Sequence, residues 1–186
     1  MHGNISTRPT RIAELMPLTP QTLGYHDASR SQEAGRVWFP TPELVPREGT
    51  PQSTALLWRV PWPQEVMSML IRDANPTGTL TSAELELSVG LMNLDAIVHC
   101  YDIRERKVVR KTDSLNTMFW ERKGSCTINY SPACLLRLFG IHQRHHRYTY
   151  RHEYQPGVSN KMADDSYRLF HLSHHKFRAH FNRHYP

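Results

Sequence analysis

The chain has 186 residues, a length typical of one domain, and 39% of them are hydrophobic. Four Trp, eight Tyr and six Phe exclude a wholly disordered chain, because such residues are scarce in sequences that cannot collapse. The formal net charge of +6 arises in the last third, where residues 121–186 hold 11 Lys and Arg against 4 Asp and Glu, with nine of the twelve His. This one-sided charge fits either a polyphosphate partner or a solvated basic tail.

The first sixty residues predict three short strands. Residues 1–19 are expected to form an irregular lead-in. Residues 22–29, 37–39 and 55–60 are apolar runs bounded by turn-forming residues, which is the pattern of strands. Four Pro and one Gly within residues 40–54 predict a loop. Short strands separated by turns are typical of an antiparallel meander.

Longer elements follow in the middle of the chain. Thr81 or Ser82 is expected to begin the longest helix, which continues through Val98. Its apolar residues cover nearly the whole circumference, and this predicts a largely buried helix. Residues 107–112 predict a fourth strand, followed by a short helix through Trp120.

The last third predicts three helices and one strand. A second long helix is expected over residues 131–147, and residues 148–154 alternate aromatic with polar side chains, as in a strand. After a Pro-Gly turn, a core helix is expected from residue 159 or 160 to about residue 170. Residues 173–184 predict one more helix, exposed to solvent.

The order of elements, βββαβαβα, predicts an α/β (mixed α+β) chain with a mixed sheet. We expect the domain to cover residues 20–172, with the lead-in 1–19 before it and a basic helix or tail over 173–186 after it. Three cysteines without a CxxC pair are expected to be reduced spectators. Because no apolar run is long enough to span a membrane and the N-terminus lacks an apolar signal core, we expect an intracellular protein, cytoplasmic or nuclear, without a membrane partner.

Four acids occupy unusual positions in this pattern. Asp27 lies near the end of an apolar strand, Asp113 ends the fourth strand, Glu86 lies inside the buried helix, and Asp164 falls in the first turns of the last core helix. Burying a carboxylate costs several kcal/mol unless the carboxylate is paired or binds a metal. Taken alone, each acid is better explained as a cap, a strand-end residue or a solvated side chain.

Glu86 is the most informative of these acids. Gly90 and Asn93 follow it on one face of the same helix. Small residues on that face indicate that a strand passes closely over it, so the Glu86 carboxylate could meet Asp27.

Together the acids and their neighbours resemble the ribonuclease H domains of reverse transcriptases of the retrotransposon type. The resemblance covers about residues 22–170. Residues 119–125 and 135–138 are also similar to reverse-transcriptase-related proteins. Four motifs carry the resemblance: Asp-Ala-Ser at 27–29, Ser-Ala-Glu-Leu-Glu-Leu at 82–87, Thr-Asp-Ser at 112–114, and Gly-x-x-Asn-x-x-Ala-Asp at 157–164.

The resemblance implies a ribonuclease H-like fold, with a five-stranded mixed sheet and helices on both faces. It also implies two Mg²⁺ ions, or Mn²⁺ in their place, roughly 4 Å apart. Asp27 would bridge them, Glu86 and Asp113 would complete one site, and Asp164 the other. The implied reaction is hydrolysis of the RNA strand of an RNA–DNA hybrid, with an attached or separate polymerase domain as a further partner. The neighbours Glu84 and Asp165 compete with Glu86 and Asp164, although the motif spacing favours the latter two.

The basic last third supplies candidate nucleic-acid contacts. Arg137 and Arg144 are seven positions apart, hence on one helix face, and Arg147 and Arg151 follow them. They could contact phosphates, or they could form a solvated surface. The histidine pairs 142/146 and 171/175 have i, i+4 spacing, but no Cys pair or acid at familiar spacing completes a zinc site, so zinc is not expected.

Two other functions compete with the nuclease. One is a catalytically inactive retroelement remnant that binds nucleic acid through its basic third. Two departures from the family pattern favour it: Ala-Gly-Arg at 34–36 replaces a Gly-Gly step, and no His occurs at 155–157. The other is an integrase or resolvase of the same fold, which would need three acids rather than four.

Overall fold

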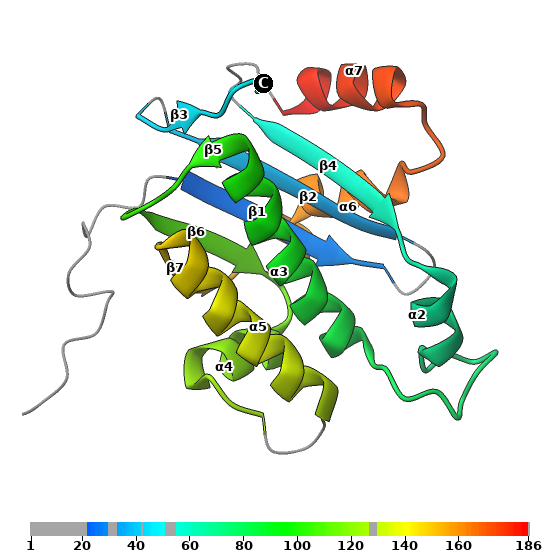
Figure 1. Ribbon diagram of the computed structural model, residues 1–186. Helices are drawn as coiled ribbons and strands as arrows, with labels where there is room; N and C mark the ends of the chain where they lie inside the picture. Colours follow the sequence, from blue (N-terminus) through cyan, green and yellow to red (C-terminus); the bar gives the residue numbers. More distant parts are fainter. Residues whose placement is uncertain (1–21, 30–32, 42, 51–54, 127–129, 186) are drawn as a thin grey trace, which may run out of the picture.

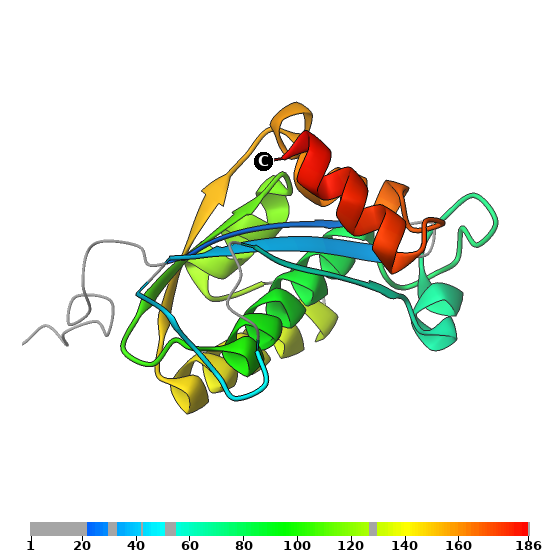
Figure 2. The same ribbon diagram turned by 90° about the horizontal axis from the view of Figure 1, so that it is seen from above.

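The protein is built around a central sheet that carries helices on both faces (Figures 1 and 2). This arrangement confirms the predicted α/β class with a five-stranded mixed sheet. The expected lead-in over residues 1–19 lies outside the described part of the chain. The computed structural model describes residues 22–29, 33–41, 43–50, 55–126 and 130–185.

The sheet has the strand order β4-β2-β1-β6-β7. Strand β2 is antiparallel to both β1 and β4, which confirms the predicted meander. Strand β6 is parallel to β1, and β7 is parallel to β6, so helical connections return the chain between them. The five strands are β1 (Thr22–Ala28), β2 (Glu33–Pro40), β4 (Leu56–Pro61), β6 (Lys107–Thr112) and β7 (Thr149–Tyr154).

One face of the sheet is covered by α3 (Ser82–Cys100) and α5 (Tyr130–His146), which lie side by side (Figure 1). The amide of Thr81 donates to the Glu84 carboxylate (2.7 Å), and this capping interaction fixes the start of α3. The predicted burial of α3 is confirmed, because its Leu and Ile side chains are enclosed between the sheet and α5. The main hydrophobic core therefore lies on this face.

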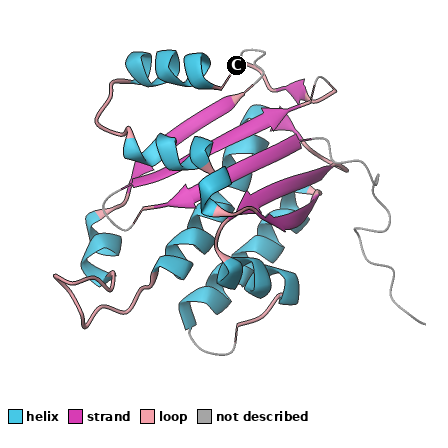
Figure 3. Ribbon diagram, turned by 180° about the vertical axis from the view of Figure 1, so that it is seen from behind, coloured by secondary structure: helices cyan, strands magenta, loops and turns pink. Residues whose placement is uncertain are grey.

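The other face carries α6 (Lys161–Arg168) and α7 (His174–His184), which Figure 3 shows from behind. Helix α7 was expected to be exposed, and for one of its faces that expectation is wrong. Phe177 and Phe181, four residues apart on one stripe, are buried in a cluster that includes Leu57 and Met162. The many basic residues of this segment conceal the apolar stripe in the sequence.

Several short elements were not predicted. Helix α2 (Gln64–Met69) has only six residues and follows a Pro. Strands β3 (Val45–Pro46) and β5 (Tyr101–Asp102) form a separate two-stranded sheet. Helix α4 (Leu115–Lys123) is the predicted short helix after the fourth strand, and it ends at Gly124, whose φ of 67° is left-handed, as is usual after a helix. No helix in the described ranges is long and apolar enough to span a membrane.

A buried ion cluster lies in the core between the sheet and the helices. It consists of Arg110 of β6, Glu121 of α4 and His152 of β7, and the Arg110 guanidinium donates to the Glu121 carboxylate and lies 3.0 Å from His152 Nδ1. Burial raises the pKa of Glu121 to about 7 although Arg110 lowers it. A Cβ at Gly90 of α3 would lie 2.6 Å from Arg110 Nη1, so glycine makes room for this side chain. At Gly90 the small face of α3 is therefore contacted by the Arg110 side chain, whereas at Glu86 it meets the end of β1, as predicted.

Candidate active site

Two acids meet where neighbouring strands end. Strands β1 and β6 are parallel and adjacent, and their register pairs Tyr25 with Lys111. Continuing that register by two residues places Asp27 beside Asp113. Because the carboxyl ends of parallel strands lie at the same edge of a sheet, the topology itself brings these two carboxylates together.

Helix α3 contributes the third acid. Glu86 is only 6% exposed, and its Oε1 accepts a hydrogen bond from the Ala28 amide (2.6 Å) at the end of β1. Carboxylate oxygens of Asp27, Glu86 and Asp113 all lie within 4.8 Å of one another, and we call this group the acid cluster. Among the described residues, Glu86 Oε2 has no hydrogen-bond partner. Glu84, the rival of Glu86, instead caps its own helix.

Burial and mutual repulsion disfavour ionisation of the acid cluster. Burial, followed by the charge of Asp113, raises the pKa of Asp27 from 3.8 to about 6. Burial, followed by the charges of Asp27 and Asp113, raises the pKa of Glu86 well above its usual value. Burial also raises the pKa of Asp113. Like charges held together out of water in this way are favourable only when a cation joins them.

Asp164 approaches the acid cluster from the opposite face of the sheet. It lies on α6, outside the group of three, and its Oδ2 accepts a hydrogen bond from Arg168 Nε (2.5 Å). Its charge nevertheless raises the pKa of both Asp27 and Asp113. Its rival Asp165 faces α7, where it accepts a hydrogen bond from the Tyr185 hydroxyl (2.7 Å). Of the two neighbours, Asp164 is therefore the one coupled to the cluster.

Asn160 and Gly157 hold the segment before α6 against the acids. The buried Asn160 side chain donates to the His26 carbonyl (3.2 Å), one residue before Asp27. A Cβ at Gly157 would lie 3.1 Å from Asp113 Oδ2, so this turn passes close to the acid cluster. From the sequence, residue 160 was expected only at the start of the last core helix, although its place in the Gly-x-x-Asn-x-x-Ala-Asp motif is a signal for this positioning role.

The four predicted nucleic-acid contacts lie on α5, directly after it and on β7. Arg137 and Arg144 are exposed on α5. Arg147 pairs with Glu105, and Arg151 of β7 pairs with Glu153. Arg151 lies opposite Val109 in the sheet, four residues before Asp113, which corresponds to roughly 13 Å along the strand.

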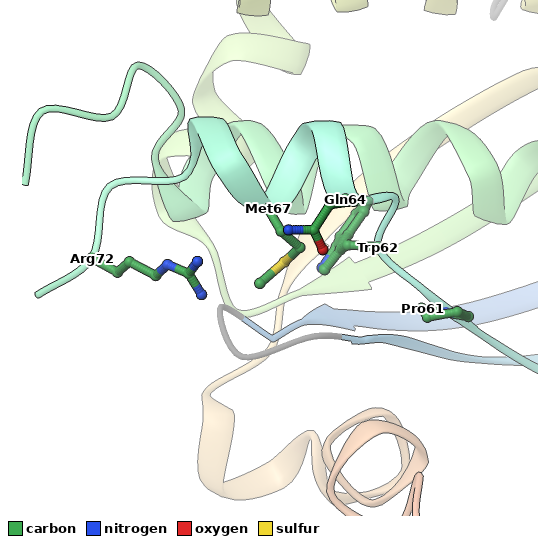
Figure 4. Close-up of a pocket in the computed structure, with 5 residues that line it drawn as sticks. All are labelled: Pro61, Trp62, Gln64, Met67 and Arg72. Atoms are coloured by element: carbon green, nitrogen blue, oxygen red, sulfur yellow. The ribbon is translucent and has the colours of Figure 1, made fainter. Parts of the chain in front are cut away.

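A pocket of about 420 Å³ adjoins the end of β1 beside α2 (Figure 4). The indole Nε1 of Trp62 donates to the Ser29 carbonyl (3.0 Å), two residues beyond Asp27, and so ties one wall of the pocket to the acid-bearing strand. Arg72 extends toward the other labelled side chains and brings positive charge near the opening (Figure 4). Sequence analysis missed this pocket, although a Trp between two Pro is an unusual residue for a plain turn. The lining residues are Pro61, Trp62, Gln64, Met67 and Arg72.

Comparison with known proteins identifies the fold. No protein-family model and no curated protein matches the chain. Among solved structures, the chain is similar to ribonuclease H1 of the halophilic archaeon Halobacterium salinarum NRC-1, with 15% identity and a TM-score of 0.43. It is also similar to LC11 ribonuclease H1 in complex with an RNA/DNA hybrid, with 13% identity and a TM-score of 0.51. Each match covers 78% of this chain and 92% of the other. At this level of identity the likeness to the LC11 protein establishes the architecture alone: the chain has a ribonuclease H-like fold.

Proposed function

We propose that this protein is a divalent-cation-dependent nuclease that hydrolyses the RNA strand of RNA–DNA hybrids. The observation that carries the proposal is the acid cluster, in which Asp27, Glu86 and Asp113 converge from two strands and a helix. Their raised pKa values indicate that the protein itself does not stabilise the ionised carboxylates, which a bound cation would. The fold is the one adopted by a protein whose structure contains an RNA/DNA hybrid.

The acid cluster fits a hard divalent cation. Mg²⁺ takes oxygen ligands at 2.0–2.1 Å, so two oxygens on one ion stand about 3 to 4 Å apart. The cluster supplies carboxylate oxygens within 4.8 Å, and the Oε2 of Glu86 is buried without a partner among the described residues. Asp164, coupled to the cluster through its charge, would serve a second ion. Mg²⁺ or Mn²⁺ suits these ligands better than a soft metal does.

We assign separate roles in cation binding and in positioning to the residues of the site. Asp27 interacts with Glu86, Asp113 and Asp164 and would therefore contact both ions. The Ala28 amide holds Glu86 Oε1, which leaves Oε2 to face a cation. Asn160 ties the segment before α6 to β1 and so keeps Asp164 near Asp27. Bound cations supply activation of the attacking water and stabilisation of the leaving 3′ oxygen.

Substrate binding would rest on shape and charge rather than on base sequence. The pocket beside β1, with Arg72 at its opening, offers a place for backbone phosphates next to the acids. Arg137 and Arg144 are exposed and free to contact phosphates farther along the hybrid. Arg147 and Arg151 belong to the same proposed surface, although each would first have to leave its carboxylate partner.

The proposal includes an origin in a reverse-transcribing element. The four acid-bearing motifs occur in the order found in the ribonuclease H domains of reverse transcriptases. An attached or separate polymerase domain would then supply the hybrid. The preference among substrates tests the proposed hybrid specificity, since such an enzyme should cleave RNA in a hybrid but neither double-stranded DNA nor double-stranded RNA.

The decisive experiment is cleavage of an end-labelled RNA–DNA hybrid with Mg²⁺. We expect Asp113→Asn and Glu86→Gln to reduce the rate at least about 100-fold, since the loss of a direct ligand exceeds the usual effect of losing an outer partner. Glu84→Gln is the matched control, because it changes the same residue type two positions away on the same helix. It should retain cleavage. Chelation of the cation should abolish cleavage by the wild type.

The same experiment separates the two candidate functions. Equal cleavage by the wild type and Asp113→Asn, or no cleavage by either, contradicts the nuclease proposal. Hybrid binding that persists without any cleavage would favour a catalytically inactive, nucleic-acid-binding remnant. In that case Arg137→Ala and Arg144→Ala should weaken binding and reduce its dependence on salt.

A further inference from the structure

A second cluster of potential metal ligands lies on the outer side of α3 and α5. Asp95 of α3 and His142 and His146 of α5 each offer a ligand atom, and these atoms lie within 4.8 Å of one another. His142 Nε2 is 3.3 Å from Asp95 Oδ1. The two His rings, one turn apart on α5, have centroids 4.4 Å apart. Two His at i, i+4 on a helix are the usual way for a helix to present two ligands on one face.

The orientation of His142 suits metal binding. Its Nδ1 lies 2.7 Å from the hydroxyl of Tyr148, which is 1% exposed. A tyrosine hydroxyl can accept a hydrogen bond as well as donate one. When Nδ1–H donates to the tyrosine oxygen, the lone pair of Nε2 faces Asp95. Metal-binding His residues are commonly fixed by a hydrogen bond of this kind at the other ring nitrogen.

We propose that Asp95, His142 and His146 bind a Zn²⁺ ion that links α3 to α5. In a tetrahedral zinc site with bonds near 2.1 Å, ligand atoms stand about 3.4 Å apart, and the His142–Asp95 distance already matches this spacing. Imidazole nitrogen favours Zn²⁺ over Mg²⁺, which prefers oxygen ligands. The sequence conceals the site because the acid lies 47 positions before His142, on another helix.

A water or His99 would complete the coordination. His99 lies one turn after Asp95 on α3, with Nδ1 2.8 Å from the Asp95 carbonyl oxygen and 3.6 Å from Asp95 Oδ1. Its Nε2 is then the nitrogen left to turn toward the ion. His145 is also close, with its ring centroid 4.6 Å from that of His146, but it does not belong to the converging group.

The zinc site is separate from the acid cluster. Asp95 lies nine residues after Glu86 on α3, which corresponds to roughly 14 Å along the helix axis. Zinc would therefore act on the structure rather than on the scissile bond. By joining α3 to α5, it would hold in place the helix that carries Glu86. The inference stands or falls independently of the proposed nuclease activity.

Titration of the full chain with Co²⁺, whose visible absorption is intense in a tetrahedral site with nitrogen ligands, measures occupancy directly. We expect one equivalent to give such a spectrum and Zn²⁺ to displace it. Zn²⁺ should raise the thermal unfolding temperature of the wild type, and Asp95→Asn should lose this gain while keeping any stabilisation by Mg²⁺ at the acid cluster. Asp95→Asn and His146→Ala should weaken Zn²⁺ binding more than about 100-fold, and Tyr148→Phe about 10- to 100-fold.

Two control variants make the result specific. His145→Ala alters a neighbouring imidazole on the same helix, and Asp113→Asn alters the acid cluster; both should retain the spectrum and the affinity. Asp95 is exposed, so Asp95→Asn should fold like the wild type, as circular dichroism will verify. Absence of a tetrahedral spectrum, equal losses in His145→Ala and His146→Ala, or loss of the spectrum in Asp113→Asn would overturn the inference.

Discussion

The described part of the protein has two buried clusters of ionisable groups, and they differ in whether the protein supplies the opposite charge. In the buried ion cluster, a guanidinium and an imidazole surround the carboxylate of Glu121. In the acid cluster, three carboxylates face one another, and the structure pairs none of them with a Lys or Arg of the described chain. Both clusters involve β6, since Arg110 lies within this strand and Asp113 directly follows it.

The difference separates charge that serves the fold from charge that serves a ligand. A buried ion pair roughly compensates its own desolvation, so removal of one partner exposes the full cost of the other. Uncompensated carboxylates, in contrast, cost stability for as long as no cation is bound. The two clusters should therefore respond to substitution with opposite signs, and this expectation can be tested from the largest effect to the smallest.

The largest effect is expected from Glu121→Ala. It leaves the fully buried Arg110 guanidinium without its carboxylate, which should reduce the free energy of unfolding by about 3–5 kcal/mol in urea denaturation. The control Glu153→Ala removes a half-exposed partner of Arg151 and should cost at most about 1 kcal/mol. Similar losses in the two variants would show that the buried ion cluster has no special role.

Asp27→Asn should act in the opposite direction. The folded-state pKa of Asp27 is raised from 3.8 to about 6, so the folded protein holds this proton more tightly than the unfolded chain does. Stability should then fall as pH rises from about 4 to 6 and stay reduced above that range. The Asn variant cannot ionise, and in chelator at pH 8 it should gain up to about 3 kcal/mol over the wild type.

The stability gain of Asp27→Asn should depend on pH and on Mg²⁺. The gain should nearly vanish at pH 4, where Asp27 is protonated in the wild type, and added Mg²⁺ should stabilise the wild type more than the variant. Asp73→Asn, in an exposed turn after α2, is the control and should show no such pH dependence. An equal difference at pH 4 and pH 8 would mean that repulsion within the acid cluster is not its origin.

The smallest effect is expected from a pair of helix glycines. Gly90→Ala places a methyl group 2.6 Å from the guanidinium of Arg110, and the crowding should cost about 1–3 kcal/mol. Gly140→Ala, in α5, meets nothing within 4 Å and should add roughly 0.5–1 kcal/mol, the usual gain in a helix interior. Thermal unfolding measures the stability of both variants against the wild type. A gain of stability in both would show that the Arg110 side chain moves aside without an energetic penalty.

The strands and the acids at their ends could be predicted because the relevant signals are local. Short runs of strand-forming residues bounded by polar residues define β1 and β6, and a strand that ends in an acid places that acid at a sheet edge. Helix α3 was equally visible from its apolar pattern. The sequence favoured Glu86 over Glu84 by motif spacing, whereas the structure distinguishes them by helix phase: one carboxylate turns to β1 and the other to its own N-terminus.

The remaining features depend on contacts between distant residues. Arg110 resembles a solvent-facing strand residue until Glu121 and His152 are brought to it. Asp95 resembles a surface acid until α5 is packed beside α3. Helix α2 is too short for its periodicity to be detected. In each case the partner lies on an element whose position only the tertiary fold determines.

The four proposed acids come from β1, α3, β6 and α6, so the site spans almost the whole length of the domain. Asp164, on α6, is the last of them to be synthesised. A nascent or truncated chain that ends before α6 would carry three of the ligands but not the fourth. The proposed nuclease would thus be inert until α6 has been synthesised, and two fragments divided between α4 and α5 would regain activity only by reassociating. Cleavage of RNA would then occur only when all four acid-bearing elements of the domain are in place.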